Sequence, residues 1–301
     1  MKLIFTYFLL IGVAFSQENA FTIPLKFGRF DENCLYRTTD KIFACHEFNQ
    51  LMEINLESPS QYLFIKNKTF THGLTALDGF NSIVYAGFSN GQLTAYNTKT
   101  KKVLFSHKDA NNSVKAIKVF QHGTYLIITD NGKILYYQNQ ILKDKADIKT
   151  NFLYLSKNQK DEGFVGVTQN WQGSIHVHQI NVSKHKIQIK KKTIKIKAPP
   201  KTLYAFNNEK LYSLVDKKLS IIDLKIGKII KEEEFLFLNV PVNFGKKGNE
   251  FFISEADGKL LFLDEISLNL RRTEVFEQQI QTLLTFNQQL FVFGFVNLIV
   301  K

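Results

Sequence analysis

A four-residue turn recurs along this chain at a nearly fixed interval, and this repeat constrains the fold more than any single residue does. Three clear copies are Ser89-Asn90-Gly91-Gln92, Asp130-Asn131-Gly132-Lys133 and Trp171-Gln172-Gly173-Ser174. Their glycines are 41 residues apart in both intervals (132 − 91 and 173 − 132). Each turn joins two short apolar runs, and Asn-Gly pairs are typical of turns that connect antiparallel strands. Every unit therefore contains a predicted β-hairpin.

The repeat continues after a slightly longer unit, at residues 216–218 and 256–259. A period of about 40 residues built only of strands is typical of a β-propeller, in which four-stranded blades surround a central axis. The apolar runs divide into seven units, from Leu35 to Lys301, and the last unit is one strand short. The spare strand is predicted at residues 21–27. We therefore expect an all-β, seven-bladed propeller of four-stranded antiparallel blades, with the last blade closed by the N-terminal strand.

The first 16 residues form a separate element. Lys2 precedes an apolar stretch, and the small residues Ala14 and Ser16 precede polar Gln17. This is the layout of a secretory signal peptide cleaved after Ser16. An uncleaved membrane anchor is the alternative, although the stretch is shorter than the ~20 residues that span a bilayer. We predict a signal peptide at 1–16, a single propeller domain at 17–301, and a protein that is secreted or held in the lumen of the endoplasmic reticulum.

Secretory routing gives meaning to three N-glycosylation sequons. They are Asn67-Lys68-Thr69, Asn111-Asn112-Ser113 and Asn181-Val182-Ser183. The repeat places them on outer strands or connecting loops, where a glycan has room. We predict that at least one of Asn67, Asn111 and Asn181 is glycosylated.

The chain has two cysteines, Cys34 and Cys45, which the repeat places on neighbouring antiparallel strands. An oxidising compartment favours a disulfide between them. A pair of buried thiols is the alternative, because the facing of the strands decides whether the sulfur atoms can meet.

Lysine alternates with isoleucine over much of the segment 184–197, which we expect to form an outer strand. One interpretation is edge protection, since lysines on an outer strand prevent pairing with other sheets. The other is a site for a polyanion, an acidic glycan or an anionic membrane surface, consistent with a net charge of +12. The candidate contacts are Lys190, Lys191, Lys192, Lys195 and Lys197. Only four arginines occur. Lysine lacks the planar guanidinium group that hydrogen-bonds to base edges, so nucleic acid is not an expected partner.

The spacing of short motifs resembles that of the WD40-repeat propellers over the whole of 17–301. Ser106-His107-Lys108 sits where that family carries its Gly-His step, and Tyr96-Asn97, Ile222-Asp223 and Leu263-Asp264 sit where it carries Trp-Asp. The chain is divergent, because no intact Gly-His and Trp-Asp pair is present. The resemblance implies a platform for protein partners.

Catalytic and metal-binding signatures are weak in this sequence. His176 and His178 alternate on one strand, but a His-x-His pair without a third ligand is a poor metal site. The segment Phe70-Thr71-His72-Gly73-Leu74 resembles a segment of propeller-type glutaminyl cyclases, although the acidic residue expected soon after it is missing. General acid–base chemistry needs such a carboxylate.

The sequence thus predicts a secreted or lumenal propeller that binds an unidentified protein, performs no catalysis and needs no cofactor or metal. The alternatives are a polyanion-binding module that uses residues 184–197 and, third, a glutaminyl-cyclase-like enzyme.

Overall fold

The computed structural model of the chain describes most of the residues after position 20. The described ranges are 21–24, 32–46, 49–108, 111–157, 163–170, 174–197, 202–207, 209–247, 249–286, 289–294 and 297–300. The predicted signal peptide, the third glycine turn at 171–173 and the end of the predicted N-terminal strand lie outside these residues.

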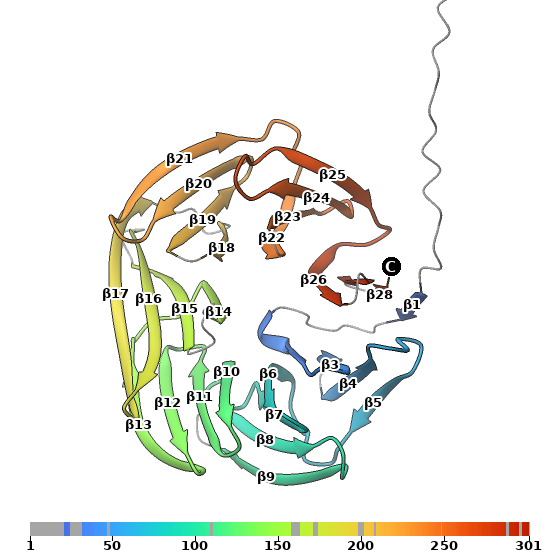
Figure 1. Cartoon of the computed structure of the whole chain (residues 1–301). Helices are drawn as coiled ribbons and strands as arrows, with labels where there is room; N and C mark the ends of the chain where they lie inside the picture. The colour runs from blue at the N-terminus through green and yellow to red at the C-terminus, as the bar shows by residue number, and fades with distance from the viewer. Residues whose placement is uncertain are drawn as a thin grey trace, which may run out of the picture.

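Seven four-stranded antiparallel sheets are arranged as blades around a central axis (Figure 1). Within blades 1 to 6 the strands follow one another from the axis outward, so each blade is a meander. The prediction of an all-β, seven-bladed propeller is confirmed. The one helical element described is the short 3-10 helix η1 (Glu32–Cys34), and no helix in the described part of the chain is long and apolar enough to cross a membrane.

The first three blades occupy the segment from Leu35 to Asp147. Blade 1 consists of β2 (Leu35–Arg37), β3 (Lys41–His46), β4 (Gln50–Asn55) and β5 (Tyr62–Lys66). Blade 2 consists of β6 (Leu74–Phe80), β7 (Ile83–Phe88), β8 (Gln92–Asn97) and β9 (Lys102–Lys108). Blade 3 consists of β10 (Val114–Gln121), β11 (Thr124–Thr129), β12 (Lys133–Gln138) and β13 (Ile141–Asp147).

The remaining blades complete the ring. Blade 4 consists of β14 (Tyr154–Lys157), β15 (Gly163–Gln169), β16 (Ser174–Ser183) and β17 (Lys186–Lys197). Blade 5 consists of β18 (Leu203–Asn207), β19 (Lys210–Val215), β20 (Lys218–Asp223) and β21 (Lys228–Glu234). Blade 6 consists of β22 (Pro241–Lys247), β23 (Glu250–Glu255), β24 (Lys259–Asp264) and β25 (Leu270–Val275). Blade 7 consists of β26 (Ile280–Phe286), β27 (Gln289–Gly294), β28 (Asn297–Val300) and β1 (Phe21–Pro24).

The position of a strand in its blade explains its composition. The second strand of a blade is covered on both faces by neighbouring blades, so β11 is buried at every residue and reads as a continuous apolar run. The outermost strand is covered less, so β9 alternates exposed and half-buried residues and β21 is mostly exposed. Lysine and glutamate therefore concentrate on the outer strands.

The hydrophobic core is divided into seven clusters, each shared by two neighbouring blades. One example joins Val119 and Tyr125 of blade 3 to Tyr85 and Leu93 of blade 2. Another joins Ile42 and Met52 of blade 1 to Phe291 and Leu298 of blade 7. Because every blade buries apolar side chains on both faces, the packing continues around the ring.

Three of the repeated turns have the backbone that the sequence predicts. Gly91, Gly132 and Gly258 have φ angles of 83°, 87° and 86°, in the left-handed region that favours glycine. In each turn the glycine N–H donates to the carbonyl three residues earlier, at 3.0 to 3.1 Å. Blade 5 has no glycine at this turn, and Asp216 adopts a φ of 51° there.

The N-terminal strand β1 lies antiparallel to β28, with Phe21 opposite Val300 and Pro24 opposite Asn297. Pro24 is tolerated because this strand has a neighbour on one side only. That β1 is what locks the ring closed stays a prediction.

Four of the turns between third and fourth strands share one hydrogen-bonding pattern. The side-chain oxygen of the last residue of the third strand accepts the backbone N–H groups two and three residues later. The four residues are Asn55, Asn97, Asp223 and Asp264. The last three occupy the positions at which the sequence resembles the Trp-Asp step. These hydrogen bonds are the main cause of the low pKa of Asp264, which is about 2.

Candidate functional site

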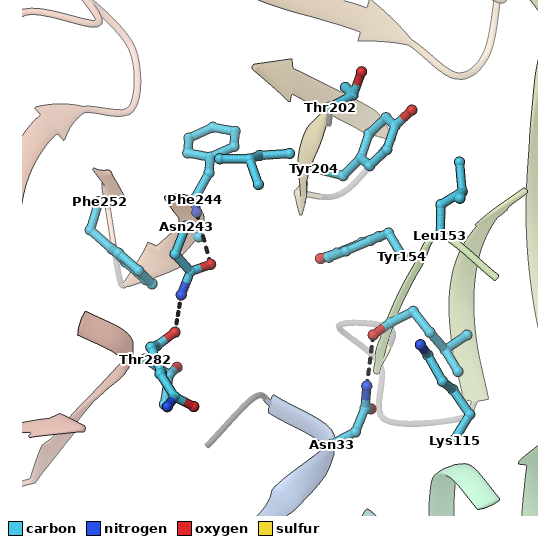
Figure 2. Close-up of a pocket in the computed structure, with 14 residues that line it drawn as sticks. Asn33, Lys115, Leu153, Tyr154, Thr202, Tyr204, Asn243, Phe244, Phe252 and Thr282 are labelled. Atoms are coloured by element: carbon cyan, nitrogen blue, oxygen red, sulfur yellow. Dashed lines mark hydrogen bonds between the residues drawn. The ribbon is translucent and has the colours of Figure 1, made fainter. Parts of the chain in front are cut away.

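A cavity of about 250 Å³ lies on the axis of the ring, near the end where the innermost strands begin (Figure 2). The innermost strands β10, β14, β18, β22 and β26 contribute to its wall, together with η1. Lys115, Tyr154, Leu203 and Gln281 are first or second residues of their strands. The volume is close to the lower limit for sites that hold small organic ligands, so a side chain or a short peptide segment fits it better.

Aromatic side chains form much of the wall. Tyr154 points into the open space from the side opposite Asn243 and Phe252 (Figure 2). The rings of Tyr154 and Tyr204 lie 6.2 Å apart. Burial raises the pKa of the Tyr204 hydroxyl above its usual range, so this group is neutral over the physiological range. The wall thus offers aromatic faces and the Tyr154 hydroxyl to a ligand.

Amide side chains hold the rest of the wall in place. Asn33 donates from Nδ2 to the carbonyl of Leu155 at 3.0 Å, which fixes η1 against blade 4. Asn243 donates to the carbonyl of Gln281 and accepts from the N–H of Phe244, so blades 6 and 7 are linked across the cavity wall. Lys115 is the one charged residue among the described lining residues. None of the described lining residues carries a carboxylate.

Exposed apolar side chains are concentrated on blades 5 and 6. Nine of the fifteen exposed large hydrophobic side chains of the described residues lie between Ile226 and Val275. Those at the end of the ring where the cavity opens are Leu236, Phe237 and Val240, between β21 and β22, and Val275 at the end of β25. Leu153, itself part of the cavity wall, is 48% exposed. Large contiguous patches of exposed apolar surface are typical of interaction sites.

A buried ion cluster lies on the opposite side of the ring. Asp78 of β6 contacts the Nζ of Lys157 from β14 at 2.6 Å and the Nζ of Lys118 from β10 at 3.9 Å. Its Oδ2 also accepts the N–H of Val119 at 2.6 Å. One carboxylate therefore connects the innermost strands of blades 2, 3 and 4.

The sequence analysis missed this cluster, although a signal was present. Asp78, Lys118 and Lys157 are separated by 40 and 39 residues (118 − 78 and 157 − 118), close to the repeat interval. Charged residues at one position of successive units predict such a cluster.

The three sequon asparagines occupy different parts of the ring. Asn67 and Asn111 lie in the loops that lead into blades 2 and 3, at the end where the cavity opens. Asn111 is exposed, whereas Asn67 is half-buried. Asn181 is not on an outermost strand or loop, because it belongs to β16, the third strand of blade 4. Whether any of them carries a glycan stays a prediction.

The predicted disulfide is not present in the structure. Cys34 ends η1 and Cys45 lies on β3, and both are buried in the cluster between blades 1 and 2. Their Sγ atoms are 2.6 Å apart, longer than the ~2.05 Å of a disulfide bond. The two residues meet as predicted, but Cys34 is the last residue of η1 and not part of a strand. The structure corresponds to the alternative of two buried thiols.

The lysine-rich segment forms the outer strand β17, as predicted, but its lysines do not share one face. Ile187 and Ile189 pack on the cluster between blades 3 and 4, whereas Ile194 packs on the cluster between blades 4 and 5. Because consecutive residues of a strand alternate, Lys191 lies on the first face and Lys190 and Lys192 on the second. Lys192 donates to the carbonyl of Lys225 in blade 5. The side chains of Lys195 and Lys197 lie outside the described residues.

The histidines form no metal site in the described part of the chain, which has no group of three or more potential ligands. His178 is buried, and its Nε2 lies 2.9 Å from the hydroxyl of Thr168. Burial, with the nearby positive charge of Lys191, lowers its pKa to about 4. His176 contacts Thr193 instead, at 3.0 Å. His72, from the cyclase-like segment, contacts Thr71 and Asn90 in an exposed position.

No protein-family model and no curated protein matches the sequence. Solved structures match the fold at low identity. A chain of the mitotic checkpoint complex has a TM-score of 0.64 and 10% identity, over 93% of this chain and 90% of that one. Sqt1 of Saccharomyces cerevisiae has a TM-score of 0.63 and 10% identity, over 88% and 82% of the two chains.

The computationally designed protein Ika8 has a TM-score of 0.61 and 13% identity, over 88% of this chain and 81% of its own. At these identities the similarity concerns the fold alone. The fold is that of a WD40-like propeller, an architecture typical of protein-interaction domains.

Proposed function

We propose that this protein is a non-catalytic propeller scaffold of the secretory pathway. In this proposal it binds another protein through the end of the ring where the axial cavity opens, on the side of blades 5 and 6. The observation that carries the proposal is the group of exposed apolar side chains at this end of the ring, Leu236, Phe237, Val240 and Val275. The fold does not need them, because the cores between blades are already filled by buried residues.

The cavity supports the same conclusion. Its small volume, aromatic walls and amide groups suit an inserted side chain of the partner, next to the exposed loop of Leu236 and Phe237. The lack of carboxylates among its described lining residues supports a binding role over a cyclase-like reaction. Aromatic anchors in a pocket surrounded by other contacts are typical of protein interfaces.

The positions of the sequons favour this side of the ring as well. Asn67 and Asn111 lie at the entrances to blades 2 and 3, whereas residues 203–275, which form blades 5 and 6, contain no sequon. If the protein is routed through the secretory pathway, glycans occupy one side of the cavity opening. The apolar side chains of the other side then stay accessible.

The test is recovery of the partner from the secretory pathway with wild-type and variant proteins. We expect the double variant Leu236→Ser, Phe237→Ser to lose a partner that the wild type recovers in stoichiometric amount. The control is Ile141→Ser, Leu142→Ser, which removes two exposed apolar side chains from β13 of blade 3. Equal recovery with both double variants would reject the proposed face, and turnover of a small molecule by partner-free protein would reject the non-catalytic role.

A second candidate function, polyanion binding, is favoured by two residues of β17. Lys190 and Lys191 are exposed. Among the described residues, no carboxylate lies within ion-pair distance of either. Binding to heparin or anionic vesicles should weaken with added salt. It should also weaken in Lys190→Glu and Lys191→Glu, but not in Lys99→Glu, a control on the exposed turn of blade 2. Unchanged binding in the β17 variants would exclude this strand.

A further inference from the structure

A second hollow lies at the end of the ring opposite the cavity opening, between blades 5 and 6. It is a groove of about 420 Å³ whose apolar lining consists of Tyr212, Ile221, Ile230 and Ile266. Tyr212 and Ile221 are buried and form its floor, whereas Ile266 is 90% exposed at its edge. A neighbouring isoleucine, Ile226, is 60% exposed. This surface therefore has both an apolar depression and an apolar projection.

The two isoleucines occupy positions that are polar in the corresponding turns of blades 1 and 2. The turns that follow Asn55, Asn97, Asp223 and Asp264 share one hydrogen-bonding pattern. Two residues after the capping residue, blades 1 and 2 have Glu57 and Lys99, whereas blade 6 has Ile266. Three residues after it, blades 1 and 2 have Ser58 and Thr100, whereas blade 5 has Ile226. The turn does not require an isoleucine, so the apolar side chains call for a separate explanation.

The charges that line the groove are balanced. The acidic side chains are Glu209, Asp223 and Glu265, and the basic side chains are Lys210, Lys225 and Lys231. Several are already satisfied within the chain: Lys225 contacts Glu209 at 2.6 Å, and Glu265 contacts Lys246 at 3.0 Å. A strongly charged partner would therefore gain little here. A partner with the same balance of charges around an apolar centre is complementary.

We infer that this groove binds a second copy of the chain, with Ile266 of each copy inserted into the groove of the other around a twofold axis. A twofold interface brings the same patch of both copies together, so the patch must be complementary to itself. This one contains the projection, the depression and equal numbers of both charges. Because the groove lies at the end opposite the cavity opening, the dimer leaves both cavity openings facing outward. The inference is independent of the proposed partner-binding face.

Sedimentation equilibrium of the purified protein between about 1 and 100 µM tests the inference. We expect a reversible dimer for the wild type, and for Ile266→Glu a dimer dissociation constant raised at least about tenfold, as for the loss of an interface hot spot. Ile226→Glu should have a smaller effect in the same direction. The matched control is Ile141→Glu, an equally apolar side chain 60% exposed on blade 3, which should leave the constant unchanged.

Because Ile266 is exposed, its variant should fold like the wild type, and an unchanged thermal unfolding curve checks this. A wild type that stays monomeric over the whole concentration range overturns the inference. So does a dimer that both Ile266→Glu and Ile226→Glu leave intact. Capture of a different protein by a monomeric wild type, lost in Ile266→Glu, would also overturn it, because the occupant would then be another chain.

Discussion

Blades 2 to 4 and blades 5 and 6 are built from the same four-stranded unit but differ in where their polar and apolar groups lie. On the first side, Asp78 connects three innermost strands through Lys118, Lys157 and the N–H of Val119. On the second side, the contact between the two blades is an apolar cluster, and further apolar side chains are exposed at both ends of the ring. The first side joins three blades through a buried ion cluster, whereas the second side exposes more hydrophobic surface.

The difference separates features that hold the ring together from features available for recognition. A buried ion cluster costs desolvation, and it persists only when every charge has a partner, so its members are needed for the fold. An exposed isoleucine contributes almost nothing to folding, so its substitution should change stability little and affect mainly the contact proposed for it. The four changes below test this separation, from the largest expected effect to the smallest.

The largest effect is expected from Asp78→Ala. The substitution leaves the ammonium group of Lys118, whose side chain is only 8% exposed, and the N–H of Val119 without their carboxylate. Breaking a buried ion pair in this way typically costs about 3–5 kcal/mol of unfolding free energy. Urea unfolding of the wild type and the variant measures this loss of unfolding free energy.

The control for Asp78→Ala is Glu232→Ala, which removes a half-exposed surface partner of Lys218 on blade 5. The urea midpoint of this variant should stay at the wild-type value, since surface ion pairs contribute little. Equal midpoint shifts in the two variants would show that the Asp78 cluster stabilises the fold no more than a surface ion pair does.

The next effect is expected from removing β1. A protein that begins at residue 25 loses the antiparallel pairing of Phe21–Pro24 with β28. At about 1 kcal/mol net for each lost hydrogen bond, we expect a decrease of roughly 2–4 kcal/mol in unfolding free energy. We also expect aggregation through the exposed edge of β28. A protein that begins at residue 17 is the control. If both proteins unfold at the same temperature in calorimetry, β1 does not close the ring.

Acid provides a graded effect, small over any one pH unit, through His178 in blade 4 on the first side. Burial lowers the pKa of His178 to about 4 from 6.5, so the folded state disfavours the protonated ring. The resulting stability is fully present above pH 6.5 and is lost as the pH falls toward 4, by up to about 1.4 kcal/mol per pH unit. His178→Gln should have a flatter dependence of unfolding free energy on pH over this window. Parallel curves for the wild type and the variant would contradict the buried, neutral state of the ring.

The smallest effect on stability is expected from Ile226→Ser and Ile266→Ser. Both side chains are mostly exposed, so thermal unfolding free energies should stay within about 0.5 kcal/mol of the wild type. A buried comparison is Ile222→Ser, next to the same turn, where loss of core packing should cost several times as much. A large loss of unfolding free energy in the exposed variants would mean that Ile226 and Ile266 stabilise the fold.

The architecture could be predicted from the sequence because the repeat is carried by local chemistry. Gly91, Gly132 and Gly258 occupy turns that need a positive φ, and the strands between them follow from the apolar runs. The outer position of residues 186–197 follows from their lysines. Such signals lie within about ten residues of one another, and they need no knowledge of how the blades meet.

The candidate sites could not be predicted in the same way, because they depend on contacts between blades. The cavity combines side chains from η1 and five innermost strands, from Asn33 to Thr282. Ile226 and Ile266 lie one repeat apart (266 − 226 = 40), but only the structure shows that Ile266 lines a groove. The cysteine pair shows the same limit: the register predicted that Cys34 and Cys45 meet, but whether the sulfur atoms are bonded depends on side-chain geometry.

One turn conformation recurs after Asn55, Asn97, Asp223 and Asp264. Its backbone does not depend on the identity of the outward-facing residues. The capping oxygen sets the backbone, while the positions two and three residues later are free to change. New binding specificities can therefore arise in evolution, or be introduced by design, through substitution at these corners with little loss of folding. These positions of blades 1, 2, 5 and 6 all lie at the end of the ring opposite the cavity opening, where their side chains can differ without changing the turn.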